Sequence, residues 1–193
     1  MIRRAFLGAA AAALAAFAAP AIAQDAENTL LIDVAGEANG TITIELLPDI
    51  APQHVERIKT LARSGAYDDV AFHRVIDGFM AQTGDVEFAT REKFGEGRAG
   101  TGGSDLPDLP AEFSDQPFER GVVGMARAQD PDSANSQFFI MFAPGDFLNG
   151  QYTVVGRVTD GMEVVDQIRR GRGQSGAVTE PDYMTDVRIA SDE

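Results

Sequence analysis

The sequence predicts a mainly β protein, in which a closed antiparallel barrel of eight strands is capped by two α-helices. Eight short segments have the apolar composition or the alternating pattern of strands, whereas only two have the periodicity of a helix. Neither an internal repeat nor a linker divides the chain. Because closure removes the exposed edges of a sheet, this set of elements favours a barrel.

The first two strand candidates are expected to form a hairpin. Residues 30–34 are a short apolar run, and residues 41–46 alternate strictly between apolar and polar side chains. Asn39-Gly40 between them is a hairpin signal. The other strand candidates, in chain order, are residues 70–76, 79–83, 122–126, 138–142, 153–158 and 185–189.

Two segments are predicted to be helical. In residues 49–64, Pro52 suits the first turn, and the apolar side chains that follow it share one face. Gly65 is expected to end this helix. Residues 162–170 form the second, shorter helix, which Gly171 is expected to end.

The N-terminus has the layout of a secretory signal peptide. Arg3 and Arg4 precede an alanine-rich apolar run, and Ala21-Ile22-Ala23 is a small-x-small cleavage site. The sequence therefore predicts a signal peptide over residues 1–23 and a mature, exported domain over residues 24–193, in the periplasm. The export route is left open. An N-terminal membrane anchor or amphipathic helix is the alternative, but a span needs about 20 apolar residues.

The chain is strongly acidic, with 30 Asp and Glu against 16 Lys and Arg and a formal net charge of −14. This excess argues against nucleic acid and anionic membranes as partners, because both need a basic footprint. The mature protein is expected to be a monomer that does not bind a membrane. The absence of cysteine excludes a disulfide and a thiol nucleophile.

Several other segments carry patterns that could indicate a function. Residues 86–118 are long, acidic and rich in Gly and Pro, and a loop of that length in a compact domain is usually functional. The G-x-G-x-x-G matches at residues 95–100 and 171–176 lack the strand–turn–helix context of a dinucleotide site and are expected to be turns. His54 and His73 have no metal-ligand spacing around them. Neither a metal nor a cofactor is expected.

Residues 72–85 and 136–140 are the most informative segments. The first brings an arginine, a glutamine and large apolar side chains close together in a strand-like run. An arginine there is costly to bury unless it is paired. One interpretation of Arg74 is an ion pair or a rim position, and the other is a charged planar donor beside an apolar pocket.

Together these segments resemble the signature of the cyclophilin family of peptidyl-prolyl isomerases. Its most specific pieces are residues 72–76, 78–85, 124–126 and 136–140, and their order along the chain makes the joint match specific. The resemblance spans residues 41–189. It implies an eight-stranded antiparallel barrel with two capping helices and a substrate groove on the outside of the barrel.

The resemblance also implies roles for individual residues. Arg74 would be catalytic, and Gln82 would orient the substrate. The main chain around Ala126-Arg127-Ala128 would hold peptide backbone, and a proline pocket would be formed by Phe79, Met80, Phe139 and Leu148. The residues expected to bind substrate are Phe79, Met80, Ala126, Arg127, Phe139, Phe147, Leu148 and Tyr152.

Three of these positions depart from many eukaryotic members of the family. Those members have tryptophan at Phe147, histidine at Tyr152 and often asparagine at Arg127, whereas bacterial members commonly look like this sequence. Phe147 and Tyr152 keep an apolar wall, and Arg127 leaves the main-chain contact possible.

The sequence thus predicts an exported bacterial peptidyl-prolyl cis/trans isomerase that assists the folding of exported proteins. Its substrates would be proline-containing polypeptides. A non-catalytic peptide-binding chaperone module on the same barrel is the alternative, although a mere binder would not need both Arg74 and Gln82. A small-molecule-binding barrel would need an enclosed lumen, which the bulky apolar side chains are expected to fill.

Overall fold

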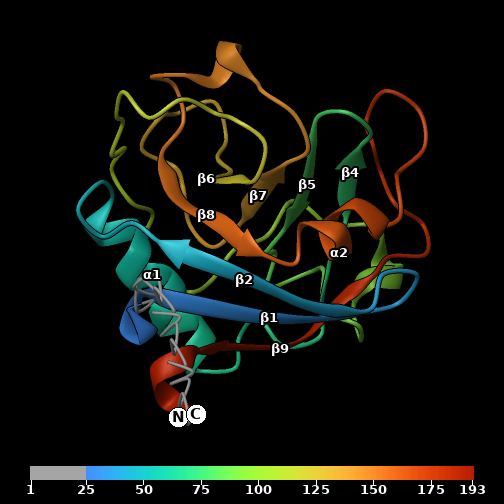
Figure 1. Ribbon diagram of the computed structural model, residues 1–193. Coiled ribbons are helices and arrows are strands. Elements are labelled where there is room, and N and C mark those ends of the chain that lie inside the picture. Colours follow the sequence, from blue (N-terminus) through green and yellow to red (C-terminus); the bar gives the residue numbers. More distant parts are fainter. Residues whose placement is uncertain (1–24) are drawn as a thin grey trace, which may run out of the picture.

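Nine strands form a single antiparallel sheet in the computed structural model, which describes residues 25–193 (Figure 1). Across the sheet their order is β3-β9-β1-β2-β8-β6-β7-β5-β4. Their bounds are β1 Thr29–Ala35, β2 Gly40–Leu46, β3 Val70–Ala71, β4 Arg74–Ile76, β5 Met80–Thr83, β6 Val122–Met125, β7 Phe138–Met141, β8 Val154–Asp160 and β9 Tyr183–Ile189. The predicted mainly β class is confirmed. The predicted signal peptide, residues 1–23, lies outside the described residues.

The sheet curls until its two end strands are joined by a short connection. β3 and β4 are separated only by Phe72 and His73, where the sequence predicts one strand over residues 70–76. The Phe72 N–H donates to the Asp182 carbonyl at 2.9 Å, and the Val178 N–H donates to the His73 carbonyl at 3.1 Å. One expected strand therefore supplies both ends of the sheet, which explains why the described chain has nine strands rather than eight.

β1 and β2 form the predicted hairpin, but the turn precedes the Asn39-Gly40 signal. Gly40 already pairs with Val34 in the ladder, so the connecting loop lies between them. The Ala38 N–H in this loop donates to the carboxylate of Asp182 at 2.8 Å, and that carboxylate is buried. A contact from a distant part of the chain thus selects a longer loop than the local signal predicts.

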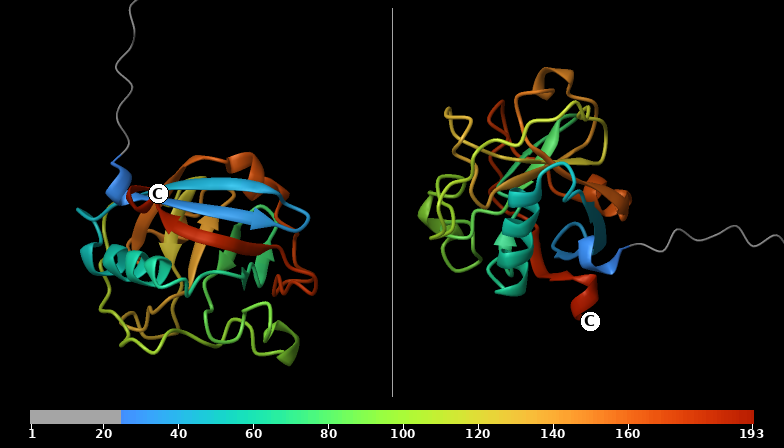
Figure 2. Two further views of the ribbon diagram at one scale, coloured as in Figure 1. Left: turned by 90° about the horizontal axis from the view of Figure 1, so that it is seen from below. Right: turned by 90° about the vertical axis from the view of Figure 1, so that its left-hand side faces the viewer.

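Helices α1 (Pro52–Arg63) and α2 (Met162–Gln167) lie at opposite ends of the long strands β1 and β2 (Figures 1 and 2). α1 buries one apolar face, as its periodicity predicts. Its first N–H groups are satisfied from outside the helix: the Glu112 carboxylate accepts from Gln53 at 3.2 Å and from His54 at 3.1 Å. This contact ties the helix to the long loop ahead of β6.

α2 is shorter than the helix predicted over residues 162–170. It ends at Gln167 because Ile168 leaves the helical conformation, with ψ at 128°. The Arg169 N–H then donates to the Asp182 carboxylate at 2.7 Å. Asp182 thus fixes both this exit and the β1–β2 loop.

Side chains from alternate strand positions fill the barrel interior. The largest of them are fully buried, and they include Ile32, Ile42, Ile44 and Phe138. A barrel of this size holds a packed core in its interior. The interior is therefore occupied by the protein's own side chains, as the sequence analysis expects.

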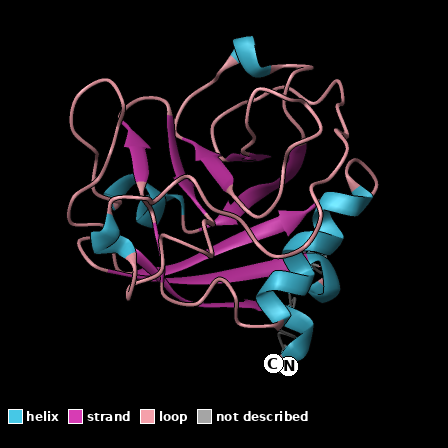
Figure 3. Ribbon diagram, turned by 180° about the vertical axis from the view of Figure 1, so that it is seen from behind, coloured by secondary structure: helices cyan, strands magenta, loops and turns pink. Residues whose placement is uncertain are grey.

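Much of the remaining chain is loop (Figure 3). Within the long loop predicted over residues 86–118, the structure has one short 3₁₀-helix, η2 (Phe94–Glu96). Three more 3₁₀-helices are η1 (Ala26–Asn28), η3 (Asp146–Leu148) and η4 (Ala190–Asp192). No helix in residues 25–193 is both long enough and apolar enough to cross a membrane.

The two ends of the described chain meet at one place. The Arg63 guanidinium at the end of α1 forms ion pairs with Glu27 and with Asp192, each at 2.9 Å. In Figure 1 both ends lie at the bottom of the molecule, whereas β6, β7 and η3 lie toward the top. Both ends of the described chain are thus remote from that part of the barrel.

Candidate active site

Strands β5 to β8 carry a second apolar cluster on the outer face of the barrel. In β7, Phe138 and Ile140 belong to the interior, whereas Phe139 and Met141 belong to this outer cluster. The alternation follows from the two-residue period of a strand. The outer cluster comprises Met80, Phe118, Val122, Phe139, Met141, Leu148 and Val154. The same strands therefore build both the core and an apolar surface outside it.

A cavity of about 420 Å³ lies over this outer cluster. Its lining includes all ten residues that the sequence analysis assigns to the site, together with Gln151. Binding sites for small ligands commonly have volumes of about 300–1,000 Å³. The ten residues are Arg74, Phe79, Met80, Gln82, Ala126, Arg127, Phe139, Phe147, Leu148 and Tyr152.

Arg74 lies on β4 directly opposite Gln82 of β5. Its Nη1 donates to the Oε1 of Gln82 at 3.1 Å, and its Nε donates to the carbonyl of Ser175 at 3.0 Å. Within residues 25–193 no carboxylate pairs with this guanidinium and no group accepts a bond from Nη2. Burial lowers the pKa of Arg74, but an arginine remains charged in a protein. The ion-pair interpretation is therefore excluded for the described chain.

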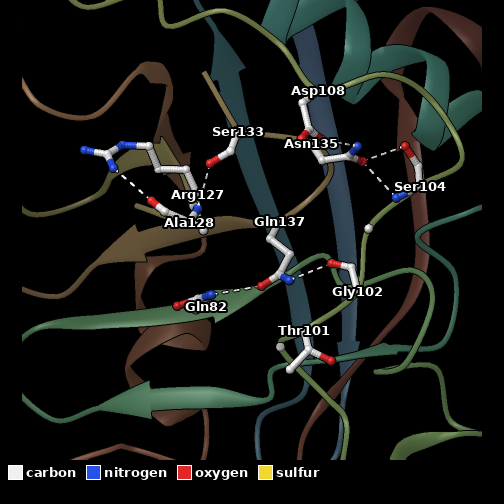
Figure 4. A pocket seen from close by; sticks show the side chains of 13 residues that line it. Gln82, Thr101, Gly102, Ser104, Asp108, Arg127, Ala128, Ser133, Asn135 and Gln137 are labelled. Carbon is white, nitrogen blue, oxygen red and sulfur yellow. Dashed lines mark hydrogen bonds between the residues drawn. The ribbon is translucent and has the colours of Figure 1, made fainter. Parts of the chain in front are cut away.

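The partner of Arg74, Gln82, begins a line of hydrogen-bonded groups that runs through Gln137 to Gly102 (Figure 4). The Nε2 of Gln82 donates to the Oε1 of Gln137 at 2.9 Å, and the Nε2 of Gln137 donates to the carbonyl of Gly102 at 2.8 Å. These bonds fix the direction of the Gln82 amide, and so of the oxygen that receives Arg74. Gln137 was not predicted as a site residue, although it lies in the segment 136–140 that carries the family resemblance.

Aromatic rings build the walls of the cavity. Phe139 stacks on Phe118 with ring centroids 5.7 Å apart, and it meets Tyr152 edge to face at 5.9 Å. At the other side, the rings of Phe79 and Phe147 lie 5.4 Å apart. Because Phe147 is 66% exposed, it forms an outer lip rather than a floor. The result is an apolar slot open to solvent at one side.

A second cavity, of about 490 Å³, adjoins the first (Figure 4). The two share Gln82, Ala126 and Arg127. The rest of the second lining is mostly polar and includes the glycine-rich stretch 100–104. The long loop that the sequence predicts to be functional thus contributes one wall of this cavity.

Asp85 holds that wall in place. Its buried carboxylate accepts the N–H groups of Gly100 at 2.7 Å and of Gly102 at 3.0 Å. A Cβ on Gly102 would lie 2.5 Å from the Asp85 Oδ1, so a side chain there would displace the loop. The G-x-G-x-x-G match at residues 95–100 begins in η2 and ends at Gly100, in the turn that Asp85 holds, and no helix follows it as a dinucleotide site would require.

The chemistry open to the first cavity is limited. Its lining contains no carboxylate, histidine, serine or cysteine, and the one hydroxyl in it is the phenol of Tyr152. Within residues 25–193 no three metal-ligating side chains gather into a group that could hold a metal ion. The site can hold an apolar ring and offer one charged planar donor beside that ring.

Comparisons with known proteins agree with this chemistry. The family model described as cyclophilin type peptidyl-prolyl cis-trans isomerase/CLD matches residues 31–191. A probable peptidyl-prolyl cis-trans isomerase of Brucella suis biovar 1 (strain 1330) is 58% identical over 174 residues, which cover 89% of this chain and 87% of that protein. Peptidyl-prolyl cis-trans isomerase cyp15 of Rhizopus delemar is 43% identical over 141 residues, or 69% of this chain and 20% of that protein.

Solved structures show the same fold. A cyclophilin from Hirschia baltica superposes with a TM-score of 0.73 at 28% identity, covering 88% of this chain and 76% of that one. A cyclophilin type isomerase from Cryptosporidium parvum, solved in the presence of the dipeptide Ala-Pro, gives a TM-score of 0.71 at 26% identity, covering 83% and 98%. The predicted fold and isomerase function are confirmed, and this chain belongs to the cyclophilin-type peptidyl-prolyl cis-trans isomerase family.

Proposed function

We propose that the first cavity, the outer groove of the barrel, is the active site. In it Arg74 is the catalytic donor and Gln82 orients the substrate. The observation that carries this proposal is the state of Arg74. Its guanidinium has no carboxylate partner in the described chain, lies at the edge of an apolar slot and keeps the donors of Nη2 unused. A proline ring in the slot would bring its nitrogen beside those donors.

The reaction needs only a stabilised twisted state. Rotation about a peptide bond breaks amide resonance and has a barrier of about 18–20 kcal/mol. Twisting localises a lone pair on the prolyl nitrogen, and the Arg74 guanidinium hydrogen-bonds that nitrogen better in the twisted state than in the planar state. Such differential binding accelerates a step. Since no group is transferred, the reaction requires no cofactor.

The other groove residues hold the substrate. The proline ring packs among Met80, Phe139 and Leu148, with Phe79 and Phe147 at the lip, and the main chain at residues 126–127 lies alongside the peptide. The Ala-Pro dipeptide used with the Cryptosporidium parvum relative supports proline-containing polypeptides as the substrate class. The cavity beyond Arg127 gives an extended chain room to continue.

Exchange NMR on a short Ala-Pro peptide tests this function directly. Catalytic amounts of the protein should produce cis/trans exchange cross-peaks on a timescale of seconds, where the free peptide takes tens to hundreds of seconds. Peptide binding without faster exchange would favour the non-catalytic chaperone module instead.

The loop over residues 171–177 contacts Arg74 and the strand β4 that carries it. The Ser175 carbonyl accepts from Arg74, and the Gly176 carbonyl accepts the N–H of Val75 at 2.8 Å. Gly176 has a φ of 70°, and a Cβ there would collide with the Ile76 Cγ1 and lie 3.0 Å from the Val75 carbonyl oxygen. A side chain at this position must therefore displace the loop from β4.

We expect Gly176→Ala to lower kcat/KM about tenfold, because small misplacements of a catalytic group reduce rate strongly. Gly173→Ala is the matched control. It carries the same backbone strain, with a φ of 65°, but its Cβ would meet nothing within 4 Å. Protease-coupled isomerisation measures both variants. Equal losses in the two would show that the loop does not position Arg74.

We also propose that the protein is exported, to a periplasm, where it assists the folding of exported proteins. The signal-peptide pattern supports this, and so does the start of the fold. Asp25, the second residue after the expected cleavage site, caps η1, and Glu27 pairs with Lys59 at 3.2 Å. Cleavage after Ala23 would remove none of these contacts. Because one chain supplies every residue of the groove, we propose a monomer.

N-terminal sequencing of the exported protein should begin at Gln24. The reason is the small-x-small pattern of Ala21-Ile22-Ala23 behind the apolar run. An Ala23→Phe variant, with a bulky residue at the cleavage site, should accumulate as the precursor. A wild-type protein that stays in the membrane fraction with an N-terminus at Met1 or Ile2 would support the anchor alternative.

A further inference from the structure

Arg127 stands between the two cavities, but its guanidinium is committed to main-chain carbonyls. Nη1 donates to the carbonyls of Ala128 at 2.9 Å and Gln129 at 3.2 Å. Nε and Nη2 both donate to the carbonyl of Gln151, at 3.3 and 2.9 Å. A guanidinium has five N–H donors, so these four bonds leave one at most. The side chain therefore has little capacity to bind substrate.

These bonds tie together two loops that are distant in sequence. The first, residues 128–133, flanks the second cavity, and the Ala128 N–H within it is held by the Ser133 hydroxyl at 3.0 Å (Figure 4). The second, residues 147–152, supplies Phe147, Leu148 and Tyr152 to the first cavity. Arg127 thus connects the walls of the two adjoining cavities through its four hydrogen bonds, which together form the Arg127 strap.

The strap also acts on the ring wall. The guanidinium carbon of Arg127 lies 4.5 Å from the centroid of the Tyr152 ring, within the range of a cation–π contact. Tyr152 in turn meets the edge of Phe139. Arg127 therefore fixes the position of the Gln151 carbonyl and the orientation of the Tyr152 ring, which packs against Phe139 in the slot.

We infer that Arg127 is a positioning residue, which sets the spacing between the ring slot and the second cavity and so determines how tightly an extended proline peptide binds. The inference deepens the proposed function and rests on it. Arg74 lies in β4, at the end of the sheet, and shares none of these bonds. Loss of the strap should consequently weaken binding while leaving the chemical step nearly intact.

Arg127→Gln and Arg127→Lys test this inference with peptides that extend on both sides of Ala-Pro. Exchange NMR gives KM and kcat separately. Both variants should raise KM about fivefold, the equivalent of about one net hydrogen bond, with kcat within about twofold of wild type. Lysine should not rescue, because a point charge cannot bridge three carbonyls as a planar fork does.

Arg157→Gln is the control variant. Arg157 is an exposed arginine of β8 that pairs with Glu45 at 2.7 Å and lines neither cavity. It should leave KM unchanged. In the background of Tyr152→Leu, which removes the ring beneath the guanidinium, Arg127→Gln should have a smaller effect than in wild type, since contacting residues are not additive.

Three results would overturn the inference. The first is an unchanged KM in Arg127→Gln. The second is a wild-type KM in Arg127→Lys, which would mean that the charge itself contacts substrate. The third is a fall of kcat in parallel with the melting temperature, which would indicate general destabilisation. If the wild type bound the peptide without catalysing exchange, the proposed function would fail, and the same fivefold change would then be sought in the Kd.

Discussion

Arg74→Ala should lower turnover by about two to three orders of magnitude, because each tenfold corresponds to about 1.4 kcal/mol and a charge-assisted bond formed mainly in the twisted state supplies several kcal/mol. The fold should survive, since this guanidinium pairs with no carboxylate in the described chain and lies only partly buried. Arg74→Lys should also be poor, because an ammonium on a flexible stem does not reproduce the planar donor.

Protease-coupled isomerisation of a short Ala-Pro peptide, beside a thermal melt of each variant, measures this effect. Arg157→Ala removes an exposed arginine that lines neither cavity and should behave like wild type in both. Near wild-type turnover in Arg74→Ala would refute the donor role. If the wild type were equally slow, the protein would be a peptide-binding module rather than an isomerase.

Phe139→Ala should lower kcat/KM about 100-fold, and part of the loss should appear in peptide affinity. Phe139 is the ring at the centre of the slot, stacked on Phe118 and met by Tyr152. Burying an apolar side chain contributes about 1.5–3 kcal/mol, and an opened slot would forfeit much of that contribution for the proline ring. Phe139→Leu, which keeps most of the volume, should lose about tenfold.

The neighbouring residue provides the control for this prediction. Phe138 points into the barrel, where its ring lies 5.6 Å from that of Tyr67. Phe138→Leu should therefore lower the melting temperature as much as Phe139→Leu or more, yet leave kcat/KM nearly unchanged. If both leucine variants reduced kcat/KM to the same extent, the effect of Phe139 would be one of stability alone.

Alternation along the strands was sufficient to predict most of the strands and the pairing of β1 with β2, because strand formation depends on near neighbours. The division of residues 70–76 into two strands was not predictable in this way. It depends on main-chain bonds from Phe72 and His73 to the segment ahead of β9, which lies about a hundred residues away. As a result Phe72 is buried in the barrel interior, whereas Arg74 lines the outer cavity.

The groove shows a similar limit. Motif resemblance assigned ten residues that the structure brings to one cavity, because these positions carry distinctive residue types. Gln137 was passed over, since an amide reveals its partners only when Gln82 and Gly102 are placed on either side of it. The engagement of Arg127 was equally hidden, because its acceptors are carbonyls, which every residue possesses.

The ion pairs of Arg63 hold η1, ahead of β1, and η4, after β9, together on the side of the molecule away from β6, β7 and η3 (Figures 1 and 2). A domain whose two ends are neighbours enters and leaves a longer polypeptide at a single point. The barrel can therefore be inserted into a larger chain, or circularly permuted by joining these two ends, while the slot stays accessible to peptide. The position of its ends thus allows the same isomerase domain to be combined with other domains in one polypeptide.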